Sequence, residues 1–77
     1  MSATLDTMVS ILRAKFKVTK PLEASTNVND MGLDSLDVIN FLYSVEEATG
    51  VKIPDEAIAS EKLERLEQFA AYVDRNR

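Results

Sequence analysis

The 77 residues of this chain are enough for one small domain and too few for two separate hydrophobic cores. The sequence contains neither cysteine nor histidine, which excludes disulfides, the usual zinc sites, thiol nucleophiles and imidazole general bases, and we expect no metal site. The formal net charge is −4, and residues 23–56 carry eight acidic side chains and one basic one, a distribution that disfavours nucleic acid and anionic membranes as partners.

Residues 4–16 are predicted to form the first helix, with Ser2 or Thr4 as its cap. Apolar side chains recur there at the spacing of one helical face, at Leu5, Met8, Val9, Leu12 and Phe16. The first residues lack the basic start, apolar stretch and cleavage site of a secretory signal, and no apolar run is long enough to cross a bilayer. We therefore expect a cytoplasmic protein without membrane insertion.

Residues 17–34 are predicted to form a long loop, because the helical periodicity fades there. Residues typical of turns replace it, at Pro21, Ser25, Thr26, Asn27, Asn29 and Gly32. Loops of this length in a small domain are usually functional or are packed down by apolar side chains of their own. The side chains expected to do this are Leu22, Val28, Met31 and Leu33.

The second helix is predicted from Ser35 to Thr49, with Gly50 closing it in the left-handed conformation. Pro54 suits the first position of a short third helix that has Asp55 and Glu56 in its first turn. The last helix carries Leu66, Phe69, Ala70 and Val73 on one face, with Arg75 and Arg77 at its end. Its start is not fixed by the sequence, because no Gly or Pro separates Ile58 from Leu66. No segment alternates long enough to predict a sheet, so the fold class is all-α.

The predicted second helix has two apolar faces. At about 100° per residue, one sector holds the expected core face, made of Val38, Phe41, Leu42, Val45 and Ala48. Leu36, Ile39 and Tyr43 lie on nearly the opposite side, together with Asn40 and Glu47. Three interpretations of these side chains are open. They fill a second interface within the bundle, they are scattered exposed residues, or they form a docking stripe for a partner with an apolar centre and a basic edge.

Ser35 stands at the start of this helix, where free N–H groups and the helix dipole favour a phosphate ester. An ordinary capping serine is the alternative, with Asp34 competing for the same cap. Ser35 is not expected to be a catalytic nucleophile, because the chain has no histidine to accept its proton and is too short to enclose a reaction. Any chemistry at Ser35 therefore needs a catalyst from another protein, and we expect the chain not to be an enzyme.

The segment Gly32-Leu33-Asp34-Ser35-Leu36-Asp37 closely resembles the Asp-Ser-Leu signature of acyl and peptidyl carrier proteins. The resemblance extends over nearly the whole chain, through Val51-Lys52-Ile53-Pro54-Asp55-Glu56 to Ala71-Tyr72-Val73. It implies a four-helix bundle with a long loop between helices one and two and a short third helix, as a single acyl carrier domain over residues 1–77. It also implies that Ser35, flanked by Asp34 and Leu36, receives 4'-phosphopantetheine from coenzyme A.

The same resemblance implies which partners the chain meets. The family's second helix is its main recognition surface, which here implies contacts by Leu36, Asp37, Ile39, Asn40, Tyr43, Glu46 and Glu47. The implied partners are a phosphopantetheinyl transferase and enzymes with basic docking surfaces that load and transfer acyl groups in fatty acid, lipid or polyketide-type biosynthesis. We expect a monomer. We also expect an attached fatty chain to enter the bundle between helices two and three, lined by Phe41, Val45, Ile53 and Ile58.

The chain departs from the family pattern at several places, which affect the identity of its partners. Asn40 replaces a frequent acidic residue, Tyr43 replaces a frequent methionine, and the stretch from Pro54 to Leu66 is longer. Arg65 stands where a capping Thr or Ser is usual before the last helix. Cargo and pathway therefore stay open between housekeeping fatty acid synthesis and a specialised lipid, polyketide or aminoacyl carrier.

Three other functions are compatible with parts of the sequence. The first is a helical adaptor of carrier-protein fold that docks partners and is never loaded. The second is a regulatory module in which a kinase phosphorylates Ser35, although no basic cluster nearby indicates a kinase site. The third is calcium binding by Asp30, Asp34 and Asp37, whose spacing lacks the alternating ligands, central Gly and terminal Glu of a calcium loop.

Overall fold

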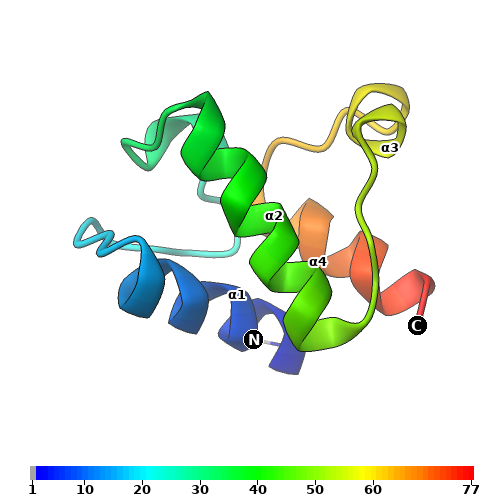
Figure 1. Cartoon of the computed structure of the whole chain (residues 1–77), viewed down its shortest axis with the longest axis horizontal. Coiled ribbons are helices and arrows are strands. Elements are labelled where there is room, and N and C mark those ends of the chain that lie inside the picture. The colour runs from blue at the N-terminus through cyan, green and yellow to red at the C-terminus, as the bar shows by residue number, and fades with distance from the viewer. Residues whose placement is uncertain (1) are drawn as a thin grey trace.

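The computed structural model describes residues 2–77, which form an all-helical bundle with no strand in that range. Its elements, in chain order, are α1 (Ala3–Lys15), the 3-10 helix η1 (Val28–Asp30), α2 (Ser35–Thr49), α3 (Asp55–Ser60) and α4 (Leu66–Arg75). Figure 1 shows α2 crossing in front of α4, α1 below both, and the short α3 at one edge of the molecule. The predicted four-helix architecture with a long first loop is confirmed.

Helix α1 begins where Ser2 caps it, since the Ser2 hydroxyl accepts a hydrogen bond of 3.0 Å from the N–H of Leu5. Thr4, the other predicted cap, is buried and its hydroxyl donates to the carboxylate of Asp74 at the far end of the chain. Both ends of the helix lie one residue earlier than predicted. Of the predicted face, Leu5, Met8 and Leu12 are buried in the core and Phe16 packs partly buried against it, whereas Val9 is only partly buried.

The long loop is packed down by the apolar side chains that the sequence indicated. Val28 and Met31 are buried, and Leu22 and Leu33 pack partly buried against the core. The loop backbone also pairs with the start of α4: Val28 N–H donates to Glu64 O at 2.8 Å, and Leu66 N–H donates to Thr26 O at 3.0 Å. Glu67 N–H donates to Ala24 O at 2.9 Å. Loop carbonyls therefore satisfy amides that a helix start leaves without partners.

Helix α2 has the predicted bounds, from Ser35 to Thr49, and Gly50 follows it with φ of 76°. Phe41, Leu42 and Val45 are buried and Val38 is partly buried against them, so this part of the predicted core face is confirmed. Ala48 is exposed, and its assignment to the core was wrong. Two buried residues that follow the helix, Val51 and Ile53, fill the core near its last turn instead.

Helix α3 begins one residue later than predicted, with Pro54 as its flanking residue and Asp55 and Glu56 in its first turn. It ends where Lys62 takes the left-handed conformation, with φ of 52°, and where Leu63 N–H donates to Ile58 O at 3.0 Å. Among residues 2–77, no helix is both long and apolar enough to span a membrane.

Helix α4 starts at Leu66 without a Ser or Thr cap. The side-chain oxygen of Gln68 accepts hydrogen bonds from the N–H groups of Glu64, at 2.9 Å, and Arg65, at 2.8 Å. Gln68 therefore supplies a polar partner at the helix start, where the family pattern has a capping residue at the position of Arg65. All four residues of the predicted apolar face, Leu66, Phe69, Ala70 and Val73, are buried.

Candidate functional site

Ser35 is the first residue of α2 and is exposed, and it does not make the cap hydrogen bond of the helix. Asp34 makes it, because its Oδ1 accepts from the N–H of Asp37 at 2.8 Å. The helical hydrogen bonds begin with Val38 N–H to Asp34 O at 3.0 Å, so the N–H groups of Ser35 and Leu36 lie outside them. An exposed hydroxyl beside such amides, at the positive end of a 15-residue helix, fits a phosphate ester.

The turn that leads to Ser35 is anchored in the core on one side. Met31 is buried and Leu33 is partly buried, and Gly32 between them has φ of 81°. A Cβ added at Gly32 would approach only the ammonium of Lys20, at 4.0 Å, so the backbone conformation and not a lack of space requires glycine here. This turn brings Asp34 and Ser35 to the surface.

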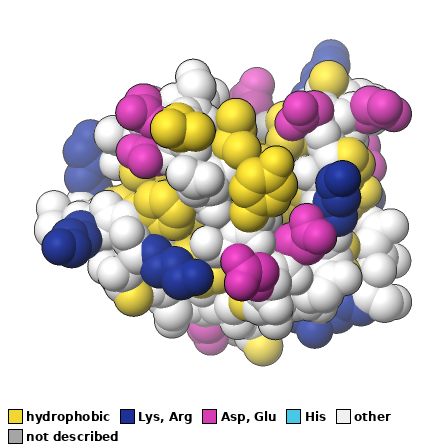
Figure 2. Space-filling view, in the orientation of Figure 1, with side chains coloured by type: hydrophobic (Ala, Val, Ile, Leu, Met, Phe, Trp, Pro, Cys, Tyr) yellow, Lys and Arg dark blue, Asp and Glu magenta, His cyan; other side chains and the backbone are white. Residues whose placement is uncertain are grey.

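An exposed apolar stripe runs along α2 from the residue after Ser35. It consists of Leu36, Ile39 and Tyr43, whose side chains are 65%, 45% and 58% exposed. The predicted second face of the helix is therefore real, and these residues do not fill an interface inside the bundle. Figure 2 shows hydrophobic side chains across the middle of this face, with acidic side chains around them.

The polar residues predicted beside the stripe lie on the same helix. Asn40 and Glu47 are exposed, whereas Asp37 and Glu46 are half-buried. The ion pairs of residues 2–77 join Arg65 to Glu67, Arg75 to Glu61 and Arg77 to Asp74, so they neutralise none of the α2 carboxylates. The charges along α2 are therefore available to a basic partner.

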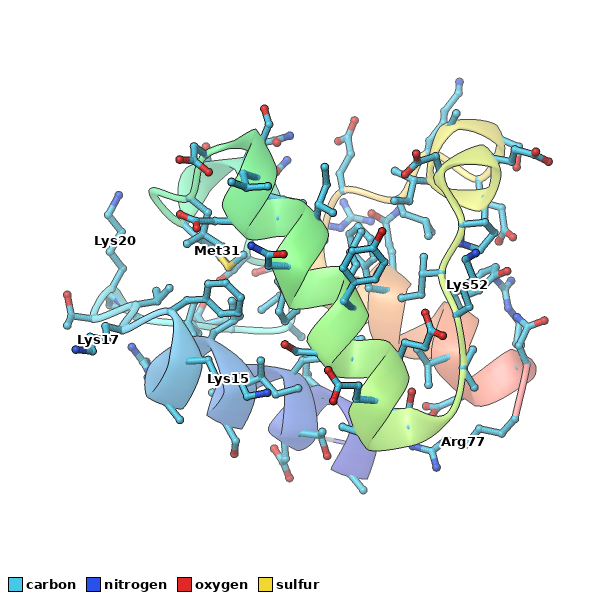
Figure 3. The ribbon with its side chains drawn as sticks, viewed as in Figure 1. Lys15, Lys17, Lys20, Met31, Lys52 and Arg77 are labelled. Carbon is cyan, nitrogen blue, oxygen red and sulfur yellow. The ribbon has the colours of Figure 1, made fainter. Side chains whose placement is uncertain are left out.

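An open cleft of about 370 Å³ lies beside the stripe, between α2 and the segment that leads into α3. Its walls are formed by Ile39, Leu42, Tyr43, Glu46, Lys52, Ile53, Pro54, Asp55 and Glu56. Figure 1 shows why these residues meet: after Gly50 the chain turns and runs back along α2. Figure 3 shows Lys52 on this returning segment.

This open cleft is distinct from the interior lining expected for an attached fatty chain, and that expectation stays a prediction. Of Phe41, Val45, Ile53 and Ile58, only Ile53 lines the cleft. Phe41 and Val45 have no exposed surface, because they are packed inside the core. Sequence reasoning missed Lys52 and the segment from Pro54 to Glu56 as walls of the cleft, because Gly50 signals the end of α2 but not the direction in which the chain continues.

The described residues, 2–77, contain no group of three or more His, Cys, Asp or Glu side chains that could hold a metal ion. Asp30, Asp34 and Asp37, which the sequence places near one another, therefore do not form such a group. The carboxylate of Asp34 is instead engaged as the cap of α2.

The chain matches the family model described as the phosphopantetheine attachment site over residues 6–73. It is 34% identical to the acyl carrier protein of Zymomonas mobilis over 58 residues, which cover 75% of this chain and 72% of that protein. It is 40% identical to the acyl carrier protein of Helicobacter pylori (strain G27) over 50 residues, covering 65% of this chain and 62% of that protein. A third acyl carrier protein, from Guillardia theta, is 36% identical over 59 residues, which cover 77% of this chain and 67% of the relative.

The family-model match includes the signature segment, the exposed stripe and the start of α4. At the level of the family, such proteins are carriers and not catalysts, and they interact with enzymes and with a transferase. Their prosthetic group is covalent, and the exposed hydroxyl at the start of α2 has surroundings that suit it. The chain belongs to the acyl carrier protein family, and its cofactor is covalently attached 4'-phosphopantetheine.

Proposed function

We propose that this chain, as one carrier domain over residues 1–77, holds acyl or aminoacyl intermediates as thioesters on 4'-phosphopantetheine attached to Ser35. The observation that carries this proposal is the exposed Ser35 hydroxyl at a helix start whose cap is made by Asp34. When attached, the group supplies the terminal thiol that the chain, which has no cysteine, lacks. The pathway is fatty acid, lipid or polyketide-type biosynthesis.

Attachment requires a catalyst from outside the chain. The Ser35 oxygen forms a bond to the diphosphate phosphorus of coenzyme A that carries pantetheine. The P–O bond to the second phosphate breaks and the nucleotide leaves with that phosphate, while a base of the transferase accepts the hydroxyl proton. The chain contributes the position of the nucleophile and the N–H groups of Ser35 and Leu36 next to it. These amides and the helix dipole offset part of the repulsion between the new phosphate and the carboxylates of Asp34 and Asp37.

Partner enzymes dock on α2. Asp37, Glu46 and Glu47 attract basic surfaces and accelerate the encounter, and Leu36, Ile39 and Tyr43 supply the apolar contact at short range. Asn40 lies beside the stripe as a neutral residue and Tyr43 adds an aromatic ring, so both select among partners. Binding must be weak, because one carrier visits several enzymes and leaves each of them.

Incubation with coenzyme A and a broad-specificity phosphopantetheinyl transferase tests the attachment site. We expect the wild-type protein to gain the mass of one phosphopantetheine, measured on the intact protein. Ser35→Ala should gain none, because it lacks the hydroxyl oxygen, and should keep the helical circular dichroism spectrum of the wild type. Ser60→Ala, at an exposed serine of α3, is the matched control and should be modified like the wild type.

Two outcomes would contradict the proposal. A mass gain on Ser35→Ala would place the attachment elsewhere. A wild-type protein that folds and gains no mass would indicate the unloaded adaptor, which has the same fold and the same docking stripe.

A further inference from the structure

Lys20 connects the end of α1 with the turn that leads to Ser35. On one side, Nη1 of Arg13 in α1 donates to the backbone oxygens of Val18 and Lys20, at 2.8 Å each. On the other side, Nζ of Lys20 donates to the backbone oxygen of Asp30 at 3.5 Å. Pro21 further restricts the backbone of the residue before it. The Lys20 side chain therefore starts from a fixed backbone and ends at the last residue of η1.

The contact lies at a hollow in the long loop. The hollow has a volume of about 430 Å³, and Lys20, Asp30 and Met31 are among the residues that line it. Met31 is buried and holds the turn from the core side, whereas Asp30 is exposed. The ammonium of Lys20 lies at the exposed side of the same turn, 4.0 Å from the position of a Cβ on Gly32.

Lys20 differs in this respect from the other lysines at the end of α1. Figure 3 shows Lys15, Lys17 and Lys20 together at that end of the molecule. All three are exposed, so each could be an ordinary surface lysine whose charge is solvated and makes no specific contact. Within residues 2–77, Lys20 is the only lysine whose ammonium donates a hydrogen bond. The contact therefore singles out Lys20 from two neighbours of the same charge.

We propose that Lys20 is a positioning residue for the modification of Ser35, because it holds the turn at Asp30–Gly32 in the arrangement that presents Asp34 and Ser35 to the transferase. This inference rests on the function proposed above. A transferase that must order a loose turn on binding loses affinity, because the entropic cost of ordering a segment makes the free energy of association less favourable. The loss then appears in the KM for the carrier and not in kcat, since the reacting atoms are unchanged.

The test compares Lys20→Met, which removes the donor and keeps a long side chain, with Lys17→Met, which loses the same charge three residues earlier. For Lys20→Met we expect the KM of the carrier to rise by about two- to tenfold, the range of one hydrogen bond, at unchanged kcat. Lys17→Met should stay near the wild type. Lys20→Arg, which restores a donor of similar reach, should recover the wild-type KM.

Amide hydrogen exchange of the unmodified proteins gives a second measurement that needs no transferase. The amides of residues 30–34 should exchange faster in Lys20→Met than in Lys17→Met, with equal denaturation midpoints. Equal KM values and equal exchange for the two methionine variants would overturn the role of Lys20. A wild-type protein that is never modified would refute the proposed function instead, and the exchange measurement would still decide whether Lys20 holds the turn.

Discussion

At the start of α2, Asp34 and Ser35 are both residues that commonly cap helices, and the structure assigns the cap to Asp34. Sequence alone left this open, because Ser and Asp are nearly equal in capping preference and stand next to each other. The backbone decides: Asp34 has extended dihedral angles, with φ of −83° and ψ of 178°, whereas Ser35 already belongs to the helix. The serine is therefore not needed to stabilise the end that it occupies.

Replacement of Asp34 tests this division directly. Asp34→Ala should lower the free energy of unfolding by about 1 kcal/mol, the usual effect of losing a cap, as measured by urea denaturation. Asp34→Asn keeps an accepting oxygen and should remain close to the wild type. Ser35→Ala should also remain close. If Ser35→Ala destabilised the protein as much as Asp34→Ala, the serine and not the aspartate would be the cap.

Among the helices, the boundaries that the sequence predicted well are those marked by residues with special backbone preferences. Asp34 and Gly50 enclose α2, and Ser2 precedes α1. The boundary between α3 and α4 could not be predicted, because Lys62 occupies the left-handed position where Gly is usual, and a lysine gives no signal of a turn. Gln68, the third residue of α4, caps that helix with its side-chain oxygen, which accepts a hydrogen bond from the N–H of Arg65.

The end of α3 offers a stabilising substitution for this reason. Lys62→Gly should raise the free energy of unfolding by about 0.5 to 1 kcal/mol. A left-handed conformation costs a residue with a Cβ about 1–2 kcal/mol and costs glycine almost nothing. Part of this gain is offset because glycine has a larger conformational entropy in the unfolded chain. Thermal denaturation followed by circular dichroism measures the effect. Lys62→Ala, which removes the ammonium but keeps the Cβ, is the control and should not stabilise. A glycine variant that is less stable than the alanine variant would contradict the prediction.

The candidate site was predicted better along α2 than across to its neighbours. A helix has a fixed angular spacing, so the sequence alone placed Leu36, Ile39 and Tyr43 on a face nearly opposite the core face, and the structure shows that this face is exposed. The cleft beside them depends on how the segment after Gly50 returns, which spacing does not fix. Lys52 and the segment from Pro54 to Glu56, which form part of its wall, were therefore not predicted.

Charged side chains surround the apolar centre of the face that carries α2. Figure 2 shows acidic side chains around this centre, with Lys and Arg side chains on both sides of it. Because the acidic side chains of α2 are not neutralised by the ion pairs of residues 2–77, a basic partner meets their full field at low salt. The apolar contact made by the stripe is not screened by salt, so the electrostatic and the apolar contributions to docking can be separated.

Modification kinetics at several salt concentrations make that separation. We expect kcat/KM for the transferase reaction to fall as NaCl rises from about 50 to 500 mM, over which the screening length falls from above 10 Å to below 8 Å. The double variant Glu46→Gln and Glu47→Gln should have a lower rate at low salt and a weaker salt dependence. Glu64→Gln, outside α2, is the control. A double variant with the same salt dependence as the wild type would exclude these two carboxylates from docking.

The pairing between the long loop and the start of α4 ties two distant parts of the chain into one unit. The carbonyls of Ala24 and Thr26 accept hydrogen bonds from the first amides of α4. The position of the loop backbone therefore depends on a helix that comes about forty residues later in the sequence. A substitution that displaces the first turn of α4 therefore also removes the hydrogen-bond donors of these two loop carbonyls.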